Sequence, residues 1–424
     1  MNLQRHYVDI RDVVLDSKTT VQDHVLHLCS QELVELLQNR SFSKIEIDVA
    51  KPGECCRIIN IGDVVQPMIR LDDEDATFPG VVGAMRQAGD GRTLCLRGVV
   101  VSEVVEVPLS LGNYLDLSGP ATELSELSGK IHITLDAYPS PDVDKDEYLA
   151  ALTVASKKAA KFLAQAAKEC AADQVETFTL EREGLENLPR VAYLCNAFSH
   201  APLTDFTFYG DSMQTSLPTI VHPNEILDGA MLDRDYGQLI NADPTYYWQN
   251  QPIILELYRR HGMDLNFVGV VLSNTPHIVT DKQRNAMIAT GLIHHQLQAQ
   301  GVLITKEGGG HPQVDVQMDV ELLEGKYGIA TTLVLCEFLS PNNGSYEQVL
   351  FTTDYANAMV STGCVEPLTV GPVDKVIGET TIPFYPGFGK PGPIDPKQGF
   401  IHRNRSVRGS LGQLGGSYFT TRKF

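Results

Sequence analysis

One short motif combines the residue types of an anion-binding loop with a candidate acid and a candidate base. It consists of Glu307, Gly308, Gly309, Gly310 and His311, followed by a proline, and it lies between a predicted strand and a predicted helix. Three glycines let backbone N–H groups approach a ligand closely, and the N-terminus of the next helix favours an anion. The motif matches neither the dinucleotide fingerprint nor the P-loop. We therefore predict that the glycines bind a carboxylate or phosphate and that Glu307 and His311 are catalytic; the alternative is a tight glycine turn with an exposed His311.

A second candidate is the thiol of Cys364, in the segment Ser361–Pro367. A cysteine in a polar, glycine-containing loop could act as a nucleophile or redox thiol if a nearby cation or helix dipole lowered its pKa. The alternative is a buried, inert cysteine. Glu366 in the same segment is a candidate for substrate binding. His311 is the candidate base for Cys364, although the sequence does not show whether the two side chains meet.

The segment His222–Ala230 offers His222, Glu225 and Asp228 as acid/base groups or metal ligands. We predict that His222 binds substrate and that Asp228 is catalytic. The spacing matches no standard zinc pattern, so no metal is assigned. Alternatively, Asp228 simply forms a turn with the glycine that follows it.

Alternating strands and helices are expected to position these residues from about residue 189 onward. The predicted strands are RVAYLCNA, LNFVGVVLSN, GVLITKE and GIATTLVLCEF, and helices are predicted over 252–261, 280–299 and 314–323. This alternation predicts an α/β fold with a doubly wound, mostly parallel sheet. Ligands of such sheets lie beyond the carboxyl ends of the strands, which is where the Glu307 loop is expected.

Four segments make up the predicted organisation. Residues 1–140 form a mixed, β-rich N-terminal domain, with strands such as KIEIDVA and a helix over 30–37. A linking helix occupies 141–180, a Rossmann-like α/β domain 181–381, and a Gly/Pro-rich basic arm 382–424. The arm either docks on another subunit or is a flexible, solvated tail.

Composition restricts the partners and the compartment. The 424 residues carry a formal net charge of -19, which is unfavourable for binding nucleic acid. There is no apolar run of the length of a membrane span, and the first residues lack the apolar core of a secretory signal. Eight cysteines without a C-x-x-C pair indicate mostly buried thiols in a reducing compartment. We expect a cytoplasmic protein that associates with neither membranes nor nucleic acid.

Several longer stretches are similar to one known family. They are KPGECCRI, FPG, GRTLCLRG, LDLSGP, NLPRVAYL, HPNEILDGA, NQPIILELYRRHGMDLNFVGVVLSN, TDKQR and EGGGHP-x-x-D, spread from residue 1 to about 380. The chain resembles the precursor of the α and β subunits of component B of glycine, sarcosine and betaine reductases, and the related D-proline reductase subunit. The NQPII…VVLSN stretch is the most specific of these matches.

The resemblance implies a mechanism, but this chain lacks one group that the mechanism requires. In the family, the precursor cleaves itself before a cysteine, and the new terminal residue becomes a pyruvoyl group that forms a Schiff base with the substrate amine. A selenocysteine-containing partner then attacks, and the C–N bond is cleaved reductively. Here the corresponding residues are Asp235 and Tyr236, and Met231–Ala242 contains no Cys, Ser or Thr. We predict an uncleaved chain without a pyruvoyl group at Tyr236.

Three functions are compatible with these features. The favoured one is an oxidoreductase-like subunit of a hetero-oligomeric reductase complex, in which a homologous partner supplies a reactive Cys or selenocysteine and this chain binds a small nitrogen-containing substrate. The second is a hydrolase or lyase of a small amide or amino-acid derivative, run by His311, Glu307, Asp228 and Cys364, for which a metal becomes more plausible. The third is a non-catalytic assembly subunit.

Overall fold

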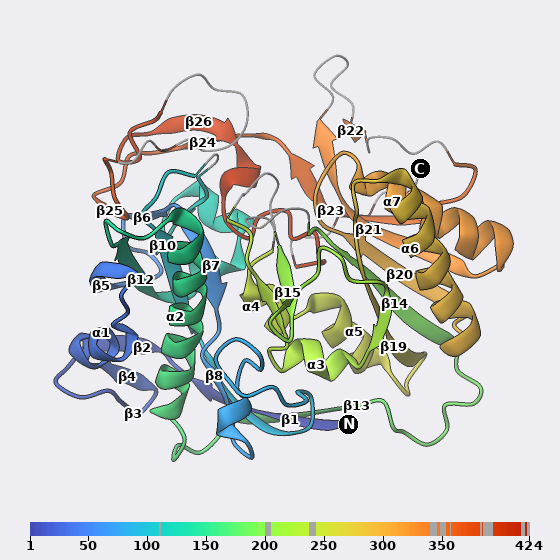
Figure 1. Cartoon of the computed structure of the whole chain (residues 1–424), viewed down its shortest axis with the longest axis horizontal. Helices are drawn as coiled ribbons and strands as arrows, with labels where there is room; N and C mark the ends of the chain where they lie inside the picture. Colours follow the sequence, from blue (N-terminus) through green and yellow to red (C-terminus); the bar gives the residue numbers. More distant parts are fainter. Residues whose placement is uncertain are drawn as a thin grey trace.

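The computed structural model contains helices and several mixed sheets, which confirms the predicted α/β class (Figure 1). The structure describes residues 1–109, 112–199, 205–236, 243–339, 346–347, 353–356, 358–381, 384, 393–416 and 420–421. Strands of the N-terminal third lie on one side of the molecule in Figure 1, and the larger C-terminal sheet lies on the other. The candidate loop belongs to the C-terminal sheet.

The N-terminal part consists of mixed sheets, as the alternating polar and apolar residues predict. The two main sheets have the orders β13-β1-β9-β8 and β5-β12-β10-β7. Their strands are β1 (Asn2–Asp9), β5 (Phe42–Ala50), β7 (Ile61–Val65), β8 (Met68–Arg70), β9 (Gly91–Arg97), β10 (Val99–Val105), β12 (Ile131–Pro139) and β13 (Gln174–Thr179). Smaller sheets use β2 (Asp12–Leu15), β3 (Thr20–Gln22), β4 (Val25–Leu28), β6 (Cys56–Ile59) and β11 (Tyr114–Asp116). The helix predicted over 30–37 is α1 (Ser30–Leu37).

Helix α2 (Lys145–Gln165) covers these N-terminal sheets. Its first turn is capped by Asp144, whose side chain accepts a hydrogen bond from the backbone N–H of Glu147 at 2.8 Å. Its apolar face packs with β-strand side chains in one buried cluster, and Figure 1 shows it beside β10 and β7. The helix therefore ends earlier than expected and packs on the N-terminal sheets.

The C-terminal sheet has five parallel strands in the order β19-β14-β20-β21-β23. They are β14 (Arg190–Ala197), β19 (Asn266–Asn274), β20 (Gly301–Lys306), β21 (Ala330–Leu339) and β23 (Met359–Val365). Antiparallel strands β17 (Thr219–Val221) and β27 (Thr420–Thr421) lie at its edges, and β22 (Tyr346–Glu347) pairs with β21. The chain order along the sheet reverses between β14 and β20. The parallel core matches the expectation, while the doubly wound, Rossmann-like layout stays a prediction.

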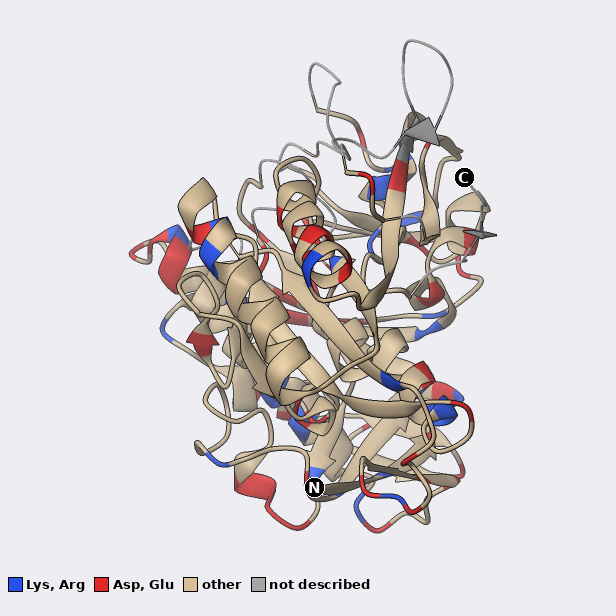
Figure 2. Cartoon of the chain, turned by 90° about the vertical axis from the view of Figure 1, so that its right-hand side faces the viewer, with Lys and Arg blue, Asp and Glu red and all other residues tan. Residues whose placement is uncertain are grey.

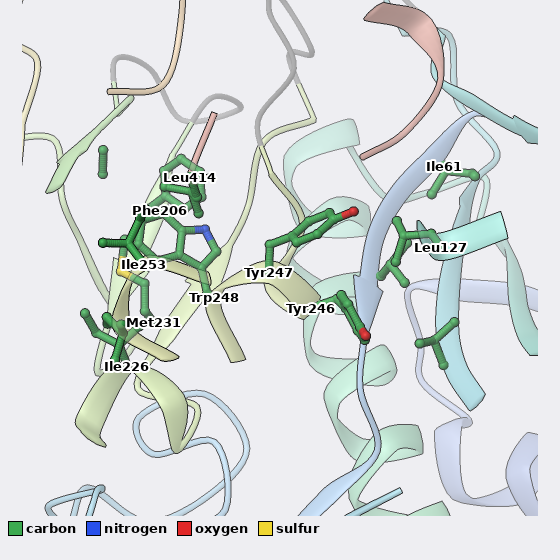
Figure 3. Close-up of a cluster of buried hydrophobic side chains, with 14 of the residues drawn as sticks. Ile61, Leu127, Phe206, Ile226, Met231, Tyr246, Tyr247, Trp248, Ile253 and Leu414 are labelled. Atoms are coloured by element: carbon green, nitrogen blue, oxygen red, sulfur yellow. The ribbon is translucent and has the colours of Figure 1, made fainter. Parts of the chain in front are cut away.

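Helices cover both faces of this sheet. Side chains of α6 (Val279–Gly291) and α7 (Pro312–Val320) share one buried cluster with strand residues, and α5 (Pro252–Arg260) shares another with the opposite face. The second cluster includes side chains of α3 (Pro223–Leu227), α4 (Thr245–Gln249), β15 (Phe206–Phe208) and β18 (Met231–Asp233). Strand β16 (Asp211–Ser212) pairs with β15. Figure 3 shows Trp248 beside Phe206 and Leu414, and the rings of Trp248 and Phe206 meet edge to face at 5.2 Å. Trp248 and Phe206 are thus core residues.

The C-terminal segment returns to the N-terminal part of the chain. Strand β25 (Lys375–Ile377) pairs with β6, and β24 (Pro367–Val370) pairs with β26 (Phe400–Arg403). Arg408 is buried and donates to Asp233 at 2.5 Å, and Leu414 is buried in the core around Trp248. These residues were expected in an intersubunit arm or a solvated tail, but they pack within their own chain. Three basic residues of the predicted arm, Lys390, Arg422 and Lys423, lie outside the described residues.

Charge is distributed over many elements. Red acidic and blue basic segments both occur on the face drawn in Figure 2, on helices as well as loops. Among the described residues, no helix has the length and apolar character needed to cross a membrane.

Candidate functional site

The glycine loop sits at the carboxyl end of β20, in the middle of the parallel strands. The backbone N–H of Glu307 donates to the carbonyl of Asn196 at 3.1 Å, which joins the loop to the end of β14. Gly308 has φ 81°, and a Cβ at this position would lie 2.4 Å from the ring of Phe198. Only glycine fits there, because a side chain would need both an unfavourable backbone conformation and a displaced aromatic ring. The loop is therefore held close against β14.

Glu307 is buried beneath this loop. Its Oε1 accepts a hydrogen bond from the backbone N–H of Asp243 at 3.1 Å, and its Oε2 has no hydrogen-bond partner among the described residues. Burial, reinforced by the nearby carboxyl of Asp243, raises the pKa of Glu307 well above its ordinary value. A raised pKa favours the protonated carboxylic acid, which is the form that can donate a proton.

His311 stands at the start of α7 and contacts a lysine. The Nζ of Lys282 lies 2.9 Å from Nδ1 of His311, and the ring of His277 lies 4.9 Å away between centroids. Burial, together with the charges of Lys282 and His277, lowers the pKa of His311 to about 4. Because the lysine donates to Nδ1, the proton of the neutral ring lies on Nε2. The ring therefore fits a hydrogen-bond donor to a ligand better than the base that the sequence suggested.

Two buried carboxyl groups on α7 complete this cluster. Asp315 forms an ion pair with Lys282, and Oδ2 of Asp319 accepts from the side-chain amide of Asn196 at 3.2 Å. Burial raises the pKa of Asp315 to about 7, against the opposing effect of Lys282, and raises that of Asp319 further. The spacing of four residues puts both carboxyls on one face of the helix.

Lys282, Asp315 and Asp319 were not among the predicted site residues. The first two belong to the TDKQR and EGGGHP-x-x-D stretches that carried the family resemblance, so a signal was present. Charged residues on a helix are usually solvated, and the sequence alone gave no reason to bury these.

Lys306 is the second basic residue near the loop. Only 1% of it is exposed, and its Nζ donates to the carbonyl oxygen of Gly308. Burial lowers its pKa, while the thiol of Cys336 on β21 raises it slightly. The sequence predictions did not include this lysine, because it lies at the end of an apolar strand where one polar residue carries no pattern.

The position aligned with the family's cleavage site lies in a different, closed cluster. The hydroxyl of Tyr236 donates to Oε2 of Glu103 at 2.7 Å and lies 2.7 Å from the hydroxyl of Thr153. Oε1 of Glu103 accepts from Lys157 at 3.2 Å, and Lys157 also contacts Asp63 at 2.7 Å. A hydrogen-bonded phenol thus occupies this position, and the absence of a pyruvoyl group stays a prediction.

Cys364 and Glu366 belong to another part of the sheet. Cys364 was expected in a loop but lies within β23, opposite Glu337 of β21, so that β21 separates its strand from β20. The extended backbone is fixed by Asn404, whose Nδ2 donates to the carbonyl of Cys364 at 2.8 Å and whose Oδ1 accepts from the N–H of Glu366 at 3.0 Å. Their catalytic and binding roles stay predictions.

His222 and Asp228 make local structural contacts at α3. His222 caps this helix, because its Nδ1 accepts a hydrogen bond from the backbone N–H of Asn224 at 3.2 Å. The carboxylate of Glu225 accepts one from the backbone N–H of His222 at 2.8 Å, which completes a capping box. Asp228 accepts from the N–H of Gly89 at 2.8 Å and from the hydroxyl of Thr93 at 2.6 Å. The structure thus brings Glu307, the glycines and His311 together and places His222 and Asp228 on a different element.

A separate cleft of about 740 Å³ lies beside α4 and α5. Aromatic side chains line part of it, among them Tyr246 and Tyr247, whose rings meet edge to face at 5.5 Å. Both tyrosines also belong to the buried core. Among the described residues, no group of three or more His, Cys, Asp or Glu side chains is arranged to hold a metal ion.

Comparison with known proteins finds relatives that match nearly the whole length of the chain. A family model described as glycine/sarcosine/betaine reductase component B subunits matches residues 1–416. The sarcosine reductase complex component B subunit alpha of Peptoclostridium acidaminophilum is 32% identical over 399 residues, covering 91% of this chain and 92% of the relative. The glycine reductase complex component B subunits alpha and beta of Acetoanaerobium sticklandii are 29% identical over 388 residues, covering 90% of each chain.

The betaine reductase complex component B subunit alpha of Peptoclostridium acidaminophilum is 30% identical over 397 residues, which is 89% of this chain and 88% of the relative. No solved structure matches the chain. With both the family match and the 32% identity extending over nine-tenths of its length, the chain belongs to the family of glycine/sarcosine/betaine reductase component B subunits.

Proposed function

We propose that the chain is an oxidoreductase-like subunit of a glycine/sarcosine/betaine-reductase-like complex and binds a small nitrogen-containing substrate at the carboxyl ends of β14 and β20. The observation that carries this is the convergence of Glu307, the glycine loop and His311 at the point where strand order reverses. In a doubly wound sheet, loops separate at such a point and leave room for a ligand. The relatives' complexes supply the substrate class.

The side chains at this edge have complementary roles in the proposal. Backbone N–H groups of Gly308–Gly310 and Nε2–H of His311 donate hydrogen bonds to the substrate. The carboxyl of Glu307, whose pKa burial raises, donates a proton to a leaving nitrogen in this proposal. Reductive cleavage needs a source of electrons, which a homologous partner subunit with a reactive Cys or selenocysteine supplies within a cytoplasmic hetero-oligomer.

The proposed subunit works without self-processing. Tyr236 offers no hydroxyl or thiol on its Cβ from which a pyruvoyl group forms, and its phenol is bonded to Glu103. Intact-mass spectrometry of purified protein should therefore give one chain of 46.6 kDa. Two fragments that join near Asp235 contradict this part of the proposal.

The binding role is tested in the assembled complex. His311→Leu should lower turnover about 10- to 100-fold, because it removes a donor aimed at the substrate. His295→Leu, on a histidine that lies beside Tyr327 away from the loop, is the matched control and should leave turnover unchanged. Equal activity of both variants counts against the site. Cys364→Ser with full activity removes Cys364 from the mechanism but leaves the site intact.

A further inference from the structure

Three buried lysines of the described chain differ in what surrounds them. Lys157 contacts the carboxylates of Asp63 and Glu103, and Lys282 contacts that of Asp315. Lys306 is just as buried, yet its only hydrogen bond within the described residues goes to the carbonyl oxygen of Gly308. A buried ammonium without an anion is costly, so the site favours either loss of the proton or arrival of a negative charge.

The groups around Lys306 do not supply that negative charge. Asn196 lies opposite it on β14 and is neutral, and Cys336 faces it from β21 as a thiol whose pKa burial raises. Arg405, from the C-terminal segment, lies near the same thiol. From α6 and α7, Lys282 is neutralised by Asp315 and His311 is uncharged.

The surroundings of the loop are instead electropositive. Lys282, His277 and Lys306 all act to lower the pKa of His311, so each lies close enough for its charge to matter there. The loop itself leads into the N-terminus of α7, where the backbone N–H groups add partial positive charge. Lys306 is tied to this loop through Gly308, which puts its amine under the same three glycines.

We propose that Lys306 anchors the carboxylate of the substrate beneath the Gly308–Gly310 loop, and that it takes up a proton as the carboxylate binds. This inference rests on the proposed function and assigns Lys306 to the carboxylate that glycine, sarcosine and betaine share. One uncompensated lysine matches the single charge of a carboxylate, whereas a phosphate dianion would leave a charge unpaired.

Isothermal titration calorimetry of the full chain, alone and with its reductase partner, tests the anchor. Glycine, sarcosine and betaine should bind, whereas glycinamide and choline, which carry the nitrogen without a carboxylate, should bind at least about 100-fold more weakly. Titrations at mildly alkaline pH in buffers of different ionisation enthalpy should show proton uptake of up to one per carboxylate bound.

Variants test whether Lys306 itself, and not the groups around it, binds the carboxylate. Lys306→Met should weaken carboxylate binding about 100-fold and abolish proton uptake, because the hydrophobic side chain fills the site without a charge. Lys158→Met, on an exposed lysine of α2, is the matched control and should change neither quantity. A thermal unfolding curve of Lys306→Met at least as stable as the parent shows that lost binding is not lost folding.

Three results overturn the inference: choline binding as tightly as betaine, unchanged betaine binding by Lys306→Met, or binding without proton uptake. In each case the assembled complex of the Lys306→Met variant still reports on the proposed function. Full turnover with this variant overturns the anchor alone, whereas a parental complex that turns over none of these amines overturns the proposed function as well.

Discussion

Two buried lysine sites, one in each half of the molecule, have opposite electrostatic designs. Around Lys157, in the N-terminal half, Asp63 and Glu103 form a closed network with Tyr236 in which every partner is a group of the protein itself. Around Lys306, in the C-terminal sheet, the described residues provide one backbone carbonyl and no carboxylate. The closed site stabilises the fold, whereas the open one costs free energy that a ligand can recover.

The difference separates a network that satisfies its own groups from a site that does not. Tyr236 stands in the closed network, whose groups are buried and bonded to one another. The carboxyl edge of the C-terminal sheet has an acid whose pKa burial raises, a histidine whose pKa burial lowers and a buried amine without a carboxylate partner, and such perturbed groups mark a candidate functional site. The following substitutions test this contrast.

The largest expected effect is at the closed site. Lys157→Met should lower the free energy of unfolding by about 3–5 kcal/mol, because it leaves two buried carboxylates without a counter-charge. Urea denaturation monitored by circular dichroism measures this. Lys161→Met, on the same helix at a partly exposed position, serves as the control. A loss at Lys157 no larger than at Lys161 would mean that the network contributes nothing.

A smaller loss is expected from the phenol in the same network. Tyr236→Phe removes the hydroxyl bonded to Glu103 and Thr153 and should cost about 1–3 kcal/mol in unfolding free energy. Tyr138→Phe removes a hydroxyl bonded to Glu46 at a more exposed position and should cost under about 0.5 kcal/mol. Similar losses from both would show that Tyr236 is not held by a buried network.

Removing the lysine from the open site should stabilise the protein instead of destabilising it. Lys306→Met should raise the unfolding free energy of the ligand-free protein by about 1 kcal/mol, because a hydrophobic side chain replaces an amine that burial penalises. The same urea experiment measures it. Destabilisation comparable to that of Lys157→Met would show that Lys306 has a partner in the fold and would remove the contrast.

The smallest expected effect is that the stabilisation of the protein by Lys306→Met changes with pH. Burial lowers the folded-state pKa of Lys306 below 10.5, so between the two values the unfolded chain binds more protons and stability rises with pH. The advantage of Lys306→Met should therefore shrink, by under about 1 kcal/mol, from about pH 7 to about pH 10. For Lys157, Asp63 and Glu103 outweigh burial and raise the pKa above 10.5, so its stabilisation is fully present below 10.5. The Lys157→Met deficit should stay constant over the same range.

Local patterns predicted the elements better than the contacts between them. The period-2 alternation of β5, the apolar run of β19 and the helix α1 are all read directly from neighbouring residues. The glycine loop was predictable as well, because its residue types and its place after a strand are local. The helix boundary of α2 and the strand containing Cys364 were not, since packing and the pairing of β23 with β21 decide them.

The sequence did not predict several residues of the site because their role depends on burial, and a residue's type alone does not indicate whether it is buried. Lys306, Lys282 and Asp319 are ordinary charged residues in the sequence, and their importance arises because distant elements cover them. His222 and Asp228 show the converse. Their residue types suggest chemistry, but His222 caps a helix, and Asp228 is bonded to the N–H of Gly89, the hydroxyl of Thr93 and the guanidinium of Arg70.

The return of the C-terminal segment also determines when the molecule can finish folding during synthesis. Leu414 packs against the core around Trp248, its N–H donates to Asp243, and Arg408 neutralises Asp233, so three interior contacts form only after residues 408–414 have been synthesised. Until residue 414 leaves the ribosome, the nascent chain exposes an unfilled apolar surface and an unpaired buried acid. This interval is when the protein is most exposed to aggregation and most dependent on chaperones.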